Sequence, residues 1–160
     1  MPEVRTAAVE DVPVIQRIAR DAWHAAYDEI LGAEAVETKI AEWYDPDDLR
    51  ESVAAEEGVF VVAGDDPAGF AQAVPGEDAW HLARIYVDPG KWGEGVGTAL
   101  LDRIETELRA AGVKRYRLGV LAENEVGVGF YESRGFERFD TWTVELAGVE
   151  TAEYWYRKAL

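Results

Sequence analysis

The chain of 160 residues has no cysteine, only two histidines and no long apolar run. Because cysteine is absent, the chain has no disulfide, no thiolate metal site and no cysteine nucleophile. His24 and His81 are too few for a histidine-based metal site, so we expect no metal. No apolar stretch approaches the ~18 residues of a membrane span, and the first residues lack the basic-then-apolar pattern of an export signal. These absences lead us to expect a cytoplasmic protein without a membrane partner.

Positive charge is also scarce. Sixteen Lys and Arg residues stand against 32 Asp and Glu residues, and the formal net charge is -16. An acidic surface repels nucleic acid and anionic membrane, so we expect neither as a partner. The surplus of acidic residues has two interpretations. It forms either a halophile-like surface that holds water and cations at high salt, or an electric field that attracts cationic amine substrates. The acids are spread along the chain, from Glu3 to Glu153. This spread favours the halophile-like interpretation, because steering needs charge near a cleft.

The composition predicts one folded domain over residues 1–160. Hydrophobic residues make up 48% of the chain and six are tryptophans, which argues against disorder. We find no internal repeat, low-complexity tract or linker. A chain of this length is long enough to bury a substantial core.

Apolar periodicity divides the chain into strands and helices. A first helix begins after Asp11, the expected N-cap, has Pro13 in its first turn, and keeps an apolar face through Ile30. The other expected helices cover residues 34–44, 47–56, 94–111 and 124–134. The expected strands cover residues 4–8, 58–63, 69–74, 79–87, 113–121, 136–146 and 150–159. This order predicts an α/β chain whose helices flank a mixed sheet.

The most informative segment lies in the middle of the chain. An apolar run ends at the turn Asp88-Pro89-Gly90, and a helical apolar pattern begins near Leu100. Between them stand three glycines at alternating positions: Gly93, Gly95 and Gly97. Glycines let the backbone approach a phosphate, and the unpaired N–H groups of a first helical turn point at it. The segment therefore predicts an anion-binding loop.

Two nucleotide-binding patterns fail at this loop. In the dinucleotide fingerprint the third glycine falls at Thr98 or at Leu100, depending on which glycine begins the pattern. In the nucleoside-triphosphate P-loop, Val96 stands where lysine is needed. A nucleotide-binding domain is thus disfavoured.

Residues 92–97, Trp-Gly-Glu-Gly-Val-Gly, resemble the acetyl-CoA loop of the GCN5-related N-acetyltransferase (GNAT) superfamily, Gln/Arg-x-x-Gly-x-Gly/Ala. Trp92 departs from the usual Gln or Arg, which matters little in a loop that works through backbone N–H groups. Residues 124–136 are similar to the family's second motif, Asn-x-x-Ala-x-x-Phe-Tyr-Glu-x-x-Gly-Phe. The two motifs stand in the family's order, about one strand apart.

The resemblance implies a largely antiparallel mixed sheet of about seven strands, in which the strand before the loop and the strand after its helix splay apart. It also implies transfer of an acetyl group from acetyl-CoA to a primary amine. Without cysteine, direct transfer in a ternary complex is expected. A small-molecule amine is favoured over a peptide amine because the long aromatic N-terminal helix is able to roof a closed pocket. A homodimer stays open, and the alternative function is a catalytically silent acyl-CoA-binding or sensing module.

The resemblance also marks the residues that bind acetyl-CoA. They are Ile85, Tyr86, Val87, Trp92, Gly93, Glu94, Gly95, Val96, Gly97, Thr98, Asn124, Gly127 and Tyr131. Backbone N–H groups of residues 85–87 are expected to stabilise the oxyanion. Asn124 is both a helix N-cap and an amide partner of the cofactor. Lys91, at the mouth of the loop, is either a phosphate contact or a solvated turn lysine.

Tyr131 is the expected general acid, because a phenol near the sulfur donates a proton to the departing thiolate. The base is harder to assign. Family members use a glutamate at a strand position that matches Gly119, so that carboxylate is missing here. His81 lies near the family's other acidic position and titrates in the right range. Weaker alternatives are Glu77, Asp78 and bulk water.

The aromatic N-terminal helix lies over the acceptor cleft in the family. Trp23 and Tyr27 share one face of this helix, and Asp28 or Glu29 is placed to meet a cation. The alternative is that the aromatic stripe is plain core.

Overall fold

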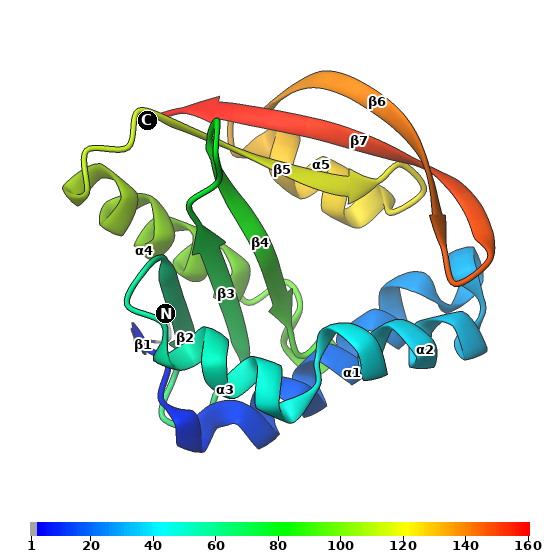
Figure 1. Cartoon of the computed structure of the whole chain (residues 1–160), viewed down its shortest axis with the longest axis horizontal. Helices are drawn as coiled ribbons and strands as arrows, with labels where there is room; N and C mark the ends of the chain where they lie inside the picture. The colour runs from blue at the N-terminus through cyan, green and yellow to red at the C-terminus, as the bar shows by residue number, and fades with distance from the viewer. Residues whose placement is uncertain (1–2) are drawn as a thin grey trace.

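The seven strands form one sheet in the order β1-β2-β3-β4-β5-β7-β6 (Figure 1). The computed structural model describes residues 3–160. The strands are β1 (Val4–Thr6), β2 (Val59–Ala63), β3 (Gly69–Val74), β4 (Trp80–Val87), β5 (Arg115–Leu121), β6 (Glu137–Leu146) and β7 (Val149–Ala159). All neighbouring strands are antiparallel except β4 and β5, which are parallel. The expected mixed, largely antiparallel sheet is confirmed.

Helices cover both faces of this sheet. They are α1 (Val12–Leu31), α2 (Ala33–Trp43), α3 (Pro46–Ala54), α4 (Val96–Ala110) and α5 (Glu125–Ser133), with short 3₁₀ turns at η1 (Val9–Asp11) and η2 (Pro89–Lys91). Alternate residues of β2 point to opposite faces: Phe60 and Val62 pack with α1–α3, whereas Val61 and Ala63 pack with α4. The sheet is therefore buried on both sides of its first half, and α4 lies opposite the three N-terminal helices.

The apolar face predicted for α1 is confirmed. Ile15, Ile18, Trp23 and Tyr27 are all buried in the core cluster on that side of the sheet. The helix begins after Asp11, but the Asp11 carboxylate does not cap it, which corrects the expected side-chain cap. Its two oxygens instead accept hydrogen bonds from the Arg5 guanidinium at 2.8 and 2.9 Å, and one of them also accepts from the Ala8 N–H. A bidentate guanidinium partner outcompetes the weaker cap.

Two element boundaries differ from the sequence patterns for backbone reasons. The helix expected over residues 94–111 begins at Val96, because Gly95 adopts a left-handed conformation with φ +84°. The strand expected from residue 113 begins at Arg115, because Gly112 has φ +80° and the Val113 N–H bonds back to the Leu108 carbonyl. Gly95 stands just before α4 and Gly112 just after it. At both positions the left-handed backbone, which strains residues other than glycine, interrupts the regular geometry.

The parallel strands β4 and β5 separate soon after they meet. Backbone pairing between them is limited to Trp80–Tyr116 and His81–Arg117. Beyond His81, β4 keeps a partner only on its β3 side, and the two strands diverge toward α1 and α5 (Figure 1). The expected splay is thus present. It leaves backbone N–H groups of β4 that face β5 without a strand partner.

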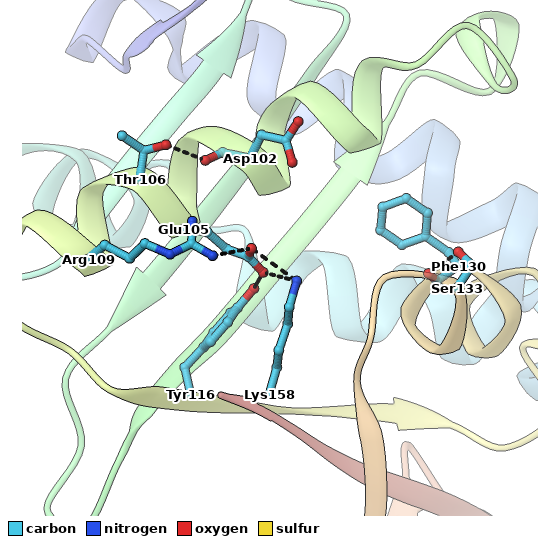
Figure 2. Close-up of polar contacts among 8 residues, drawn as sticks. All are labelled: Asp102, Glu105, Thr106, Arg109, Tyr116, Phe130, Ser133 and Lys158. Atoms are coloured by element: carbon cyan, nitrogen blue, oxygen red, sulfur yellow. Dashed lines mark hydrogen bonds and ion pairs between the residues drawn. The ribbon is translucent and has the colours of Figure 1, made fainter. Parts of the chain in front are cut away.

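A buried ionic cluster joins α4 to the beginning of β5 and the end of β7. Figure 2 shows Glu105 of α4, which is 5% exposed, between residues from β5 and β7. Its carboxylate accepts from the Tyr116 hydroxyl at 2.6 Å and pairs with Lys158 Nζ at 2.8 Å, and Arg109 lies 3.6 Å away. These contacts fasten α4 to β5 and β7.

No helix within residues 3–160 is both long enough and apolar enough to cross a membrane.

Candidate functional site

A cavity of about 690 Å³ lies between the diverging strands and reaches the N-terminus of α4. We call it the loop cavity. It is lined by most of the residues that the sequence marked for acetyl-CoA: Ile85, Tyr86, Val87, Trp92, Gly93, Gly95, Val96, Gly97, Thr98, Asn124, Gly127 and Tyr131. The structure therefore brings together two motifs that are separated by a helix and a strand. Glu94 does not line the cavity, and its side chain is exposed.

The glycines of the loop and the first turn of α4 line the loop cavity with their backbone. Gly93 and Gly95 have φ of +81° and +84°, a conformation that L side chains rarely adopt. The first bond of helix α4 runs from the Ala99 N–H to the Gly95 carbonyl at 3.0 Å. The earlier amides of the helix therefore have no intrahelical acceptor. A helix N-terminus open to a cavity in this way is suited to a phosphate.

Two cationic side chains flank this helix end. Lys91 and Arg134 line the loop cavity, and neither forms an ion pair in the part of the chain that the structure describes. Arg134 donates to the Thr98 hydroxyl and lies over the Phe130 ring at 5.5 Å. Arg84 of β4 also lines this cavity without an ion pair, whereas Lys91 and Arg134 are the two cations that adjoin the glycine loop and the first turn of α4. Together with the helix N-terminus they fit a polyanionic ligand such as the phosphates of coenzyme A.

Trp92 holds the loop against the end of β4. Its indole N–H donates to the Val87 carbonyl at 2.9 Å, although the side chain is 44% exposed. The residue that departs from the family pattern therefore has a defined local role, which is to fasten the loop to the strand before it.

Asn124 caps helix α5 as expected. Its side-chain oxygen accepts from the Gly127 N–H at 3.0 Å, and its amide donates to the Tyr27 hydroxyl at 3.3 Å. A Cβ at Gly127 would lie 2.7 Å from the Asn124 amide nitrogen, so a larger residue there would displace the Asn124 side chain. The Tyr27 hydroxyl also lies 3.4 Å from that of Tyr86. These contacts connect α1, β4 and α5 around the loop cavity.

Tyr131 lies on α5 with its ring edge against Phe130 and Phe136. Burial raises the pKa of its phenol above the ordinary value, and nearby Tyr27 adds to that rise. The phenol consequently stays protonated at neutral pH. Its place in the lining of the loop cavity is compatible with a proton donor.

A second cavity of about 380 Å³ adjoins the first. We call it the aromatic cavity, because six aromatic side chains line it: Trp23, Tyr27, Trp43, Tyr44, Tyr86 and Trp155. Burial raises the pKa of Tyr44 to about 12, so this phenol also stays neutral. The two cavities share lining residues on both diverging strands, among them Arg84, Tyr86 and Gly119. The gap between β4 and β5 therefore joins them.

His81 lines the aromatic cavity but not the loop cavity. Its ring lies edge-on to Trp155, with centroids 6.2 Å apart. A Cβ on Gly76, in the turn before β4, would lie 2.9 Å from His81 Nε2. Burial lowers the pKa of His81, and the Arg117 guanidinium lowers it further. The imidazole is therefore neutral at pH 7, with Nε2 beside the β3–β4 turn.

The structure places a carboxylate that the sequence patterns missed. Glu153 of β7 is half-buried and lines the aromatic cavity. A Cβ built on Gly119 would lie 3.1 Å from the Glu153 carboxyl carbon, so this carboxylate fills the space beside the glycine. Burial raises the pKa of Glu153, and the neighbouring Trp155 indole offsets part of that rise. The sequence offers little signal for it, because a glutamate in a strand of mixed polarity does not reveal which residue of β5 it meets.

The other expected acids lie elsewhere. Asp28 and Glu29 line neither cavity, and the Asp28 carboxylate lies 2.6 Å from His24 Nδ1. Glu77 and Asp78 are exposed in the loop before β4 and line neither cavity. The aromatic side chains Trp23 and Tyr27 are buried in the core, as the second interpretation of that stripe expects, and they also line the aromatic cavity. Within residues 3–160, no group of three or more His, Cys, Asp or Glu side chains is arranged to hold a metal.

Comparison with known proteins gives consistent matches. Residues 16–136 match the model of the acetyltransferase (GNAT) family. Spermidine N(1)-acetyltransferase of Thermoplasma acidophilum is 28% identical over 145 residues, which are 87% of this chain and 90% of that protein. The crystal structure of PaiA N-acetyltransferase from the same organism, in complex with coenzyme A, has a TM-score of 0.89 and 26% identity, and the match covers 100% of this chain and 99% of that chain. A GCN5-related N-acetyltransferase from Rhodopseudomonas palustris shares the fold, with a TM-score of 0.84, 23% identity and coverage of 100% and 96%.

Proposed function

Because the chain belongs to the GNAT acetyltransferase family and is an N-acetyltransferase, we propose that it moves an acetyl group from acetyl-CoA to a small-molecule primary amine. The observation that carries this proposal is the junction of the two cavities between β4 and β5. A donor in the loop cavity and an acceptor in the aromatic cavity meet there. Direct transfer in a ternary complex follows, since the chain has no cysteine to carry an acyl group.

The residues of the loop cavity fit coenzyme A. The amides at the start of α4 bind the pyrophosphate, and Lys91 and Arg134 are placed to neutralise phosphate charge. When bound, acetyl-CoA supplies an acetyl group activated as a thioester. Free N–H groups of β4 around residues 85–87 are available to bind the carbonyl oxygen as negative charge develops on it.

Tyr131 serves as the general acid in this proposal. Its phenol stays protonated at neutral pH and lines the same cavity as the glycine loop. Donation of this proton to the sulfur assists departure of the thiolate as the tetrahedral intermediate collapses.

The aromatic cavity supports a small amine as acceptor. Its volume of about 380 Å³ holds a metabolite-sized group rather than a folded peptide segment. Aromatic faces and one carboxylate are suited to an ammonium group. A relative that acts on spermidine, 28% identical, makes spermidine the first acceptor to test. Arg84, the one guanidinium among the lining residues of this cavity, opposes a second positive charge close to it.

A thiol-release assay tests the proposal. The protein is incubated with acetyl-CoA and, in separate reactions, spermidine, a simple alkyl monoamine, an α-amino acid and a peptide with a free N-terminus. We expect turnover with at least one free amine and none with the peptide. Turnover of the peptide alone would overturn the acceptor class. Binding of acetyl-CoA without thiol release for any amine would indicate a silent acyl-CoA-binding module.

A further inference from the structure

Glu153 has no ion-pair partner within residues 3–160, although it is half-buried and other carboxylates in this range, such as Asp11 and Glu105, are paired with Arg5 and Lys158. We propose that Glu153 is the catalytic base, which binds the acceptor's ammonium group and removes its first proton. The proposal rests on the proposed function and names the residue that prepares the nucleophile at that site.

The position of Glu153 depends on the pairing of β5 with β7. Leu121 is opposite Glu153, and Gly119 is opposite Trp155, in an antiparallel register. Side chains at opposite and diagonal positions of such a pair share one face of the sheet. Because residue 119 has no side chain, the Glu153 carboxylate and the Trp155 ring both reach into its place, 3.1 Å from where a Cβ would be. Gly119 lines both cavities, so the carboxylate lies beside their junction.

The other titratable groups that face the aromatic cavity are less suited to the role. Tyr27, Tyr44 and Tyr86 have pKa values raised by burial and are neutral donors at pH 7. Arg84 has no proton-accepting site. His81 is neutral and is the one rival, but its Nε2 faces Gly76, which lines neither cavity. Geometry therefore favours the carboxylate at the junction.

The proton balance of the step is simple. Glu153 takes one proton from the ammonium group, and the freed nitrogen lone pair forms the C–N bond with the acetyl carbon. The C–S bond breaks, and the sulfur receives a proton from Tyr131, which is restored by the second proton lost from nitrogen. Glu153 then releases its proton to water, so one proton appears in solution for each acetyl group transferred.

If ionised Glu153 is the base, kcat/KM should depend on pH in a characteristic way. Burial raises the pKa of this carboxyl, so kcat/KM should rise with pH through that raised pKa as the base form appears. Above it the profile should be flat up to the pKa of the amine, near 10 for an alkyl ammonium group. Over this plateau the enzyme uses the abundant protonated amine, because Glu153 supplies the proton transfer.

The experiment compares pH profiles of kcat/KM for the full chain and three variants, with an amine that the wild type turns over. Glu153→Gln should lower kcat/KM about 10²-fold at pH 7 and replace the plateau by a line of unit slope, since solution must then supply free amine. Glu153→Asp should keep the rise of kcat/KM at acidic pH, here called the acid limb, but reach a lower plateau. Glu150→Gln, which removes an exposed carboxylate of the same strand that lines neither cavity, should keep the wild-type profile.

A plateau that survives in Glu153→Gln would overturn the inference, and so would loss of the acid limb in Glu153→Asp. Loss of the limb in a His81→Gln variant, with the limb kept in Glu153→Gln, would assign the base to His81 instead. Affinity for acetyl-CoA, which depends on the loop cavity, should be the same in every variant and reports that the fold is intact. Absence of any acetyl transfer by the wild type would contradict the proposed function itself, which is a different result from an unchanged Glu153→Gln profile.

Discussion

Two buried or half-buried glutamates beside the β5–β7 pair have opposite surroundings. Glu105 accepts from Tyr116, pairs with Lys158 and lies near Arg109, so its charge is compensated on three sides. Glu153 faces a glycine and a tryptophan and has no cation beside it in the described residues. Glu105 lines neither cavity, whereas Glu153 lines one.

This difference separates a structural carboxylate from one that is available for chemistry. A buried charge must be paired or hydrogen-bonded, and a group whose partners come from its own fold has little left to offer a ligand. Half-burial without a partner raises the affinity of a carboxylate for a proton and for an ammonium group. The two glutamates should therefore respond to substitution in opposite ways, one in stability and the other in the pH dependence of activity.

The largest effect is expected at Lys158, the cation closest to Glu105. Lys158→Met should lower the free energy of unfolding by about 3 kcal/mol, because it leaves a buried carboxylate without its main countercharge. Urea unfolding measures this change, and the shape of the kcat/KM profile with pH should stay as in the wild type. Lys114→Met removes an exposed lysine that forms no ion pair in the described part of the chain and serves as the control. Equal losses in the two variants would show that the Glu105 cluster does not stabilise the fold.

Substitution of Tyr131 should lower activity and leave stability nearly unchanged, the reverse of the effect expected at Lys158. Tyr131→Phe keeps the packing against Phe130 and Phe136 and removes only the hydroxyl, so turnover should fall about 10²-fold while the unfolding free energy changes little. Steady-state assays of thiol release and a direct binding measurement with acetyl-CoA check both parts. Rapid turnover by the Phe variant would mean that the thiolate leaves without assistance and that Tyr131 is a core aromatic.

A smaller effect is expected from Lys91 and Arg134, the two cations of the loop cavity that flank the start of α4. Lys91→Gln and Arg134→Gln should each weaken acetyl-CoA binding roughly tenfold, as expected for the loss of one charge-assisted contact. Binding should also become less sensitive to salt, because one charge pair is removed. Titration calorimetry at two salt concentrations measures this, with Lys114→Gln as the control. Unchanged affinity would return Lys91 to the alternative interpretation of a solvated turn lysine.

The smallest effect concerns the surface and salt. With 32 acidic side chains against 16 basic ones, repulsion is strongest at low ionic strength, where the Debye length reaches ~30 Å at 0.01 M. Potassium chloride should raise stability by at least about 1 kcal/mol, which shifts Tm by about 2–4 °C in a chain of this size. Thermal unfolding from low to molar salt provides the curve. A flat curve would favour substrate steering as the reason for the acidic surface. The buried Glu105 cluster, whose charges are paired, should contribute little to the dependence of stability on salt.

Much of the fold was predictable because its signals are local. The apolar face of α1, the turn at Asp88-Pro89-Gly90 and the helix after the glycine loop all appear near their expected places. The misplaced details were end effects: the left-handed Gly95 delays α4, and the Asp11 carboxylate prefers Arg5 to the helix. Such details depend on competition between nearby groups, which periodicity does not describe.

The loop cavity was also largely predictable, whereas the aromatic cavity was predictable only in part, through Trp23, Tyr27 and His81. The glycine loop and the Asn124 helix each carry a short motif, so the sequence marked residues that the structure then gathers around one cavity. No motif contains Glu153, because its place depends on the register of β5 against β7 rather than on its neighbours in the chain. In the sequence, Gly119 stands where family members have a glutamate, so the sequence pattern lacks that carboxylate. In the structure, the Glu153 carboxylate occupies the space beside Gly119.

The sequence by itself determined the order of the elements, the anion-binding loop and the family, because each depends on residues a few positions apart. Only the tertiary structure decided that β4 and β5 part after His81, that two cavities meet in the gap, and that Glu153 lies beside the junction while Glu105 is fully paired. The physical reason is that pairing register and helix packing are set by burial over the whole sheet. A side chain's partners, and hence its charge and reactivity, follow from that global arrangement.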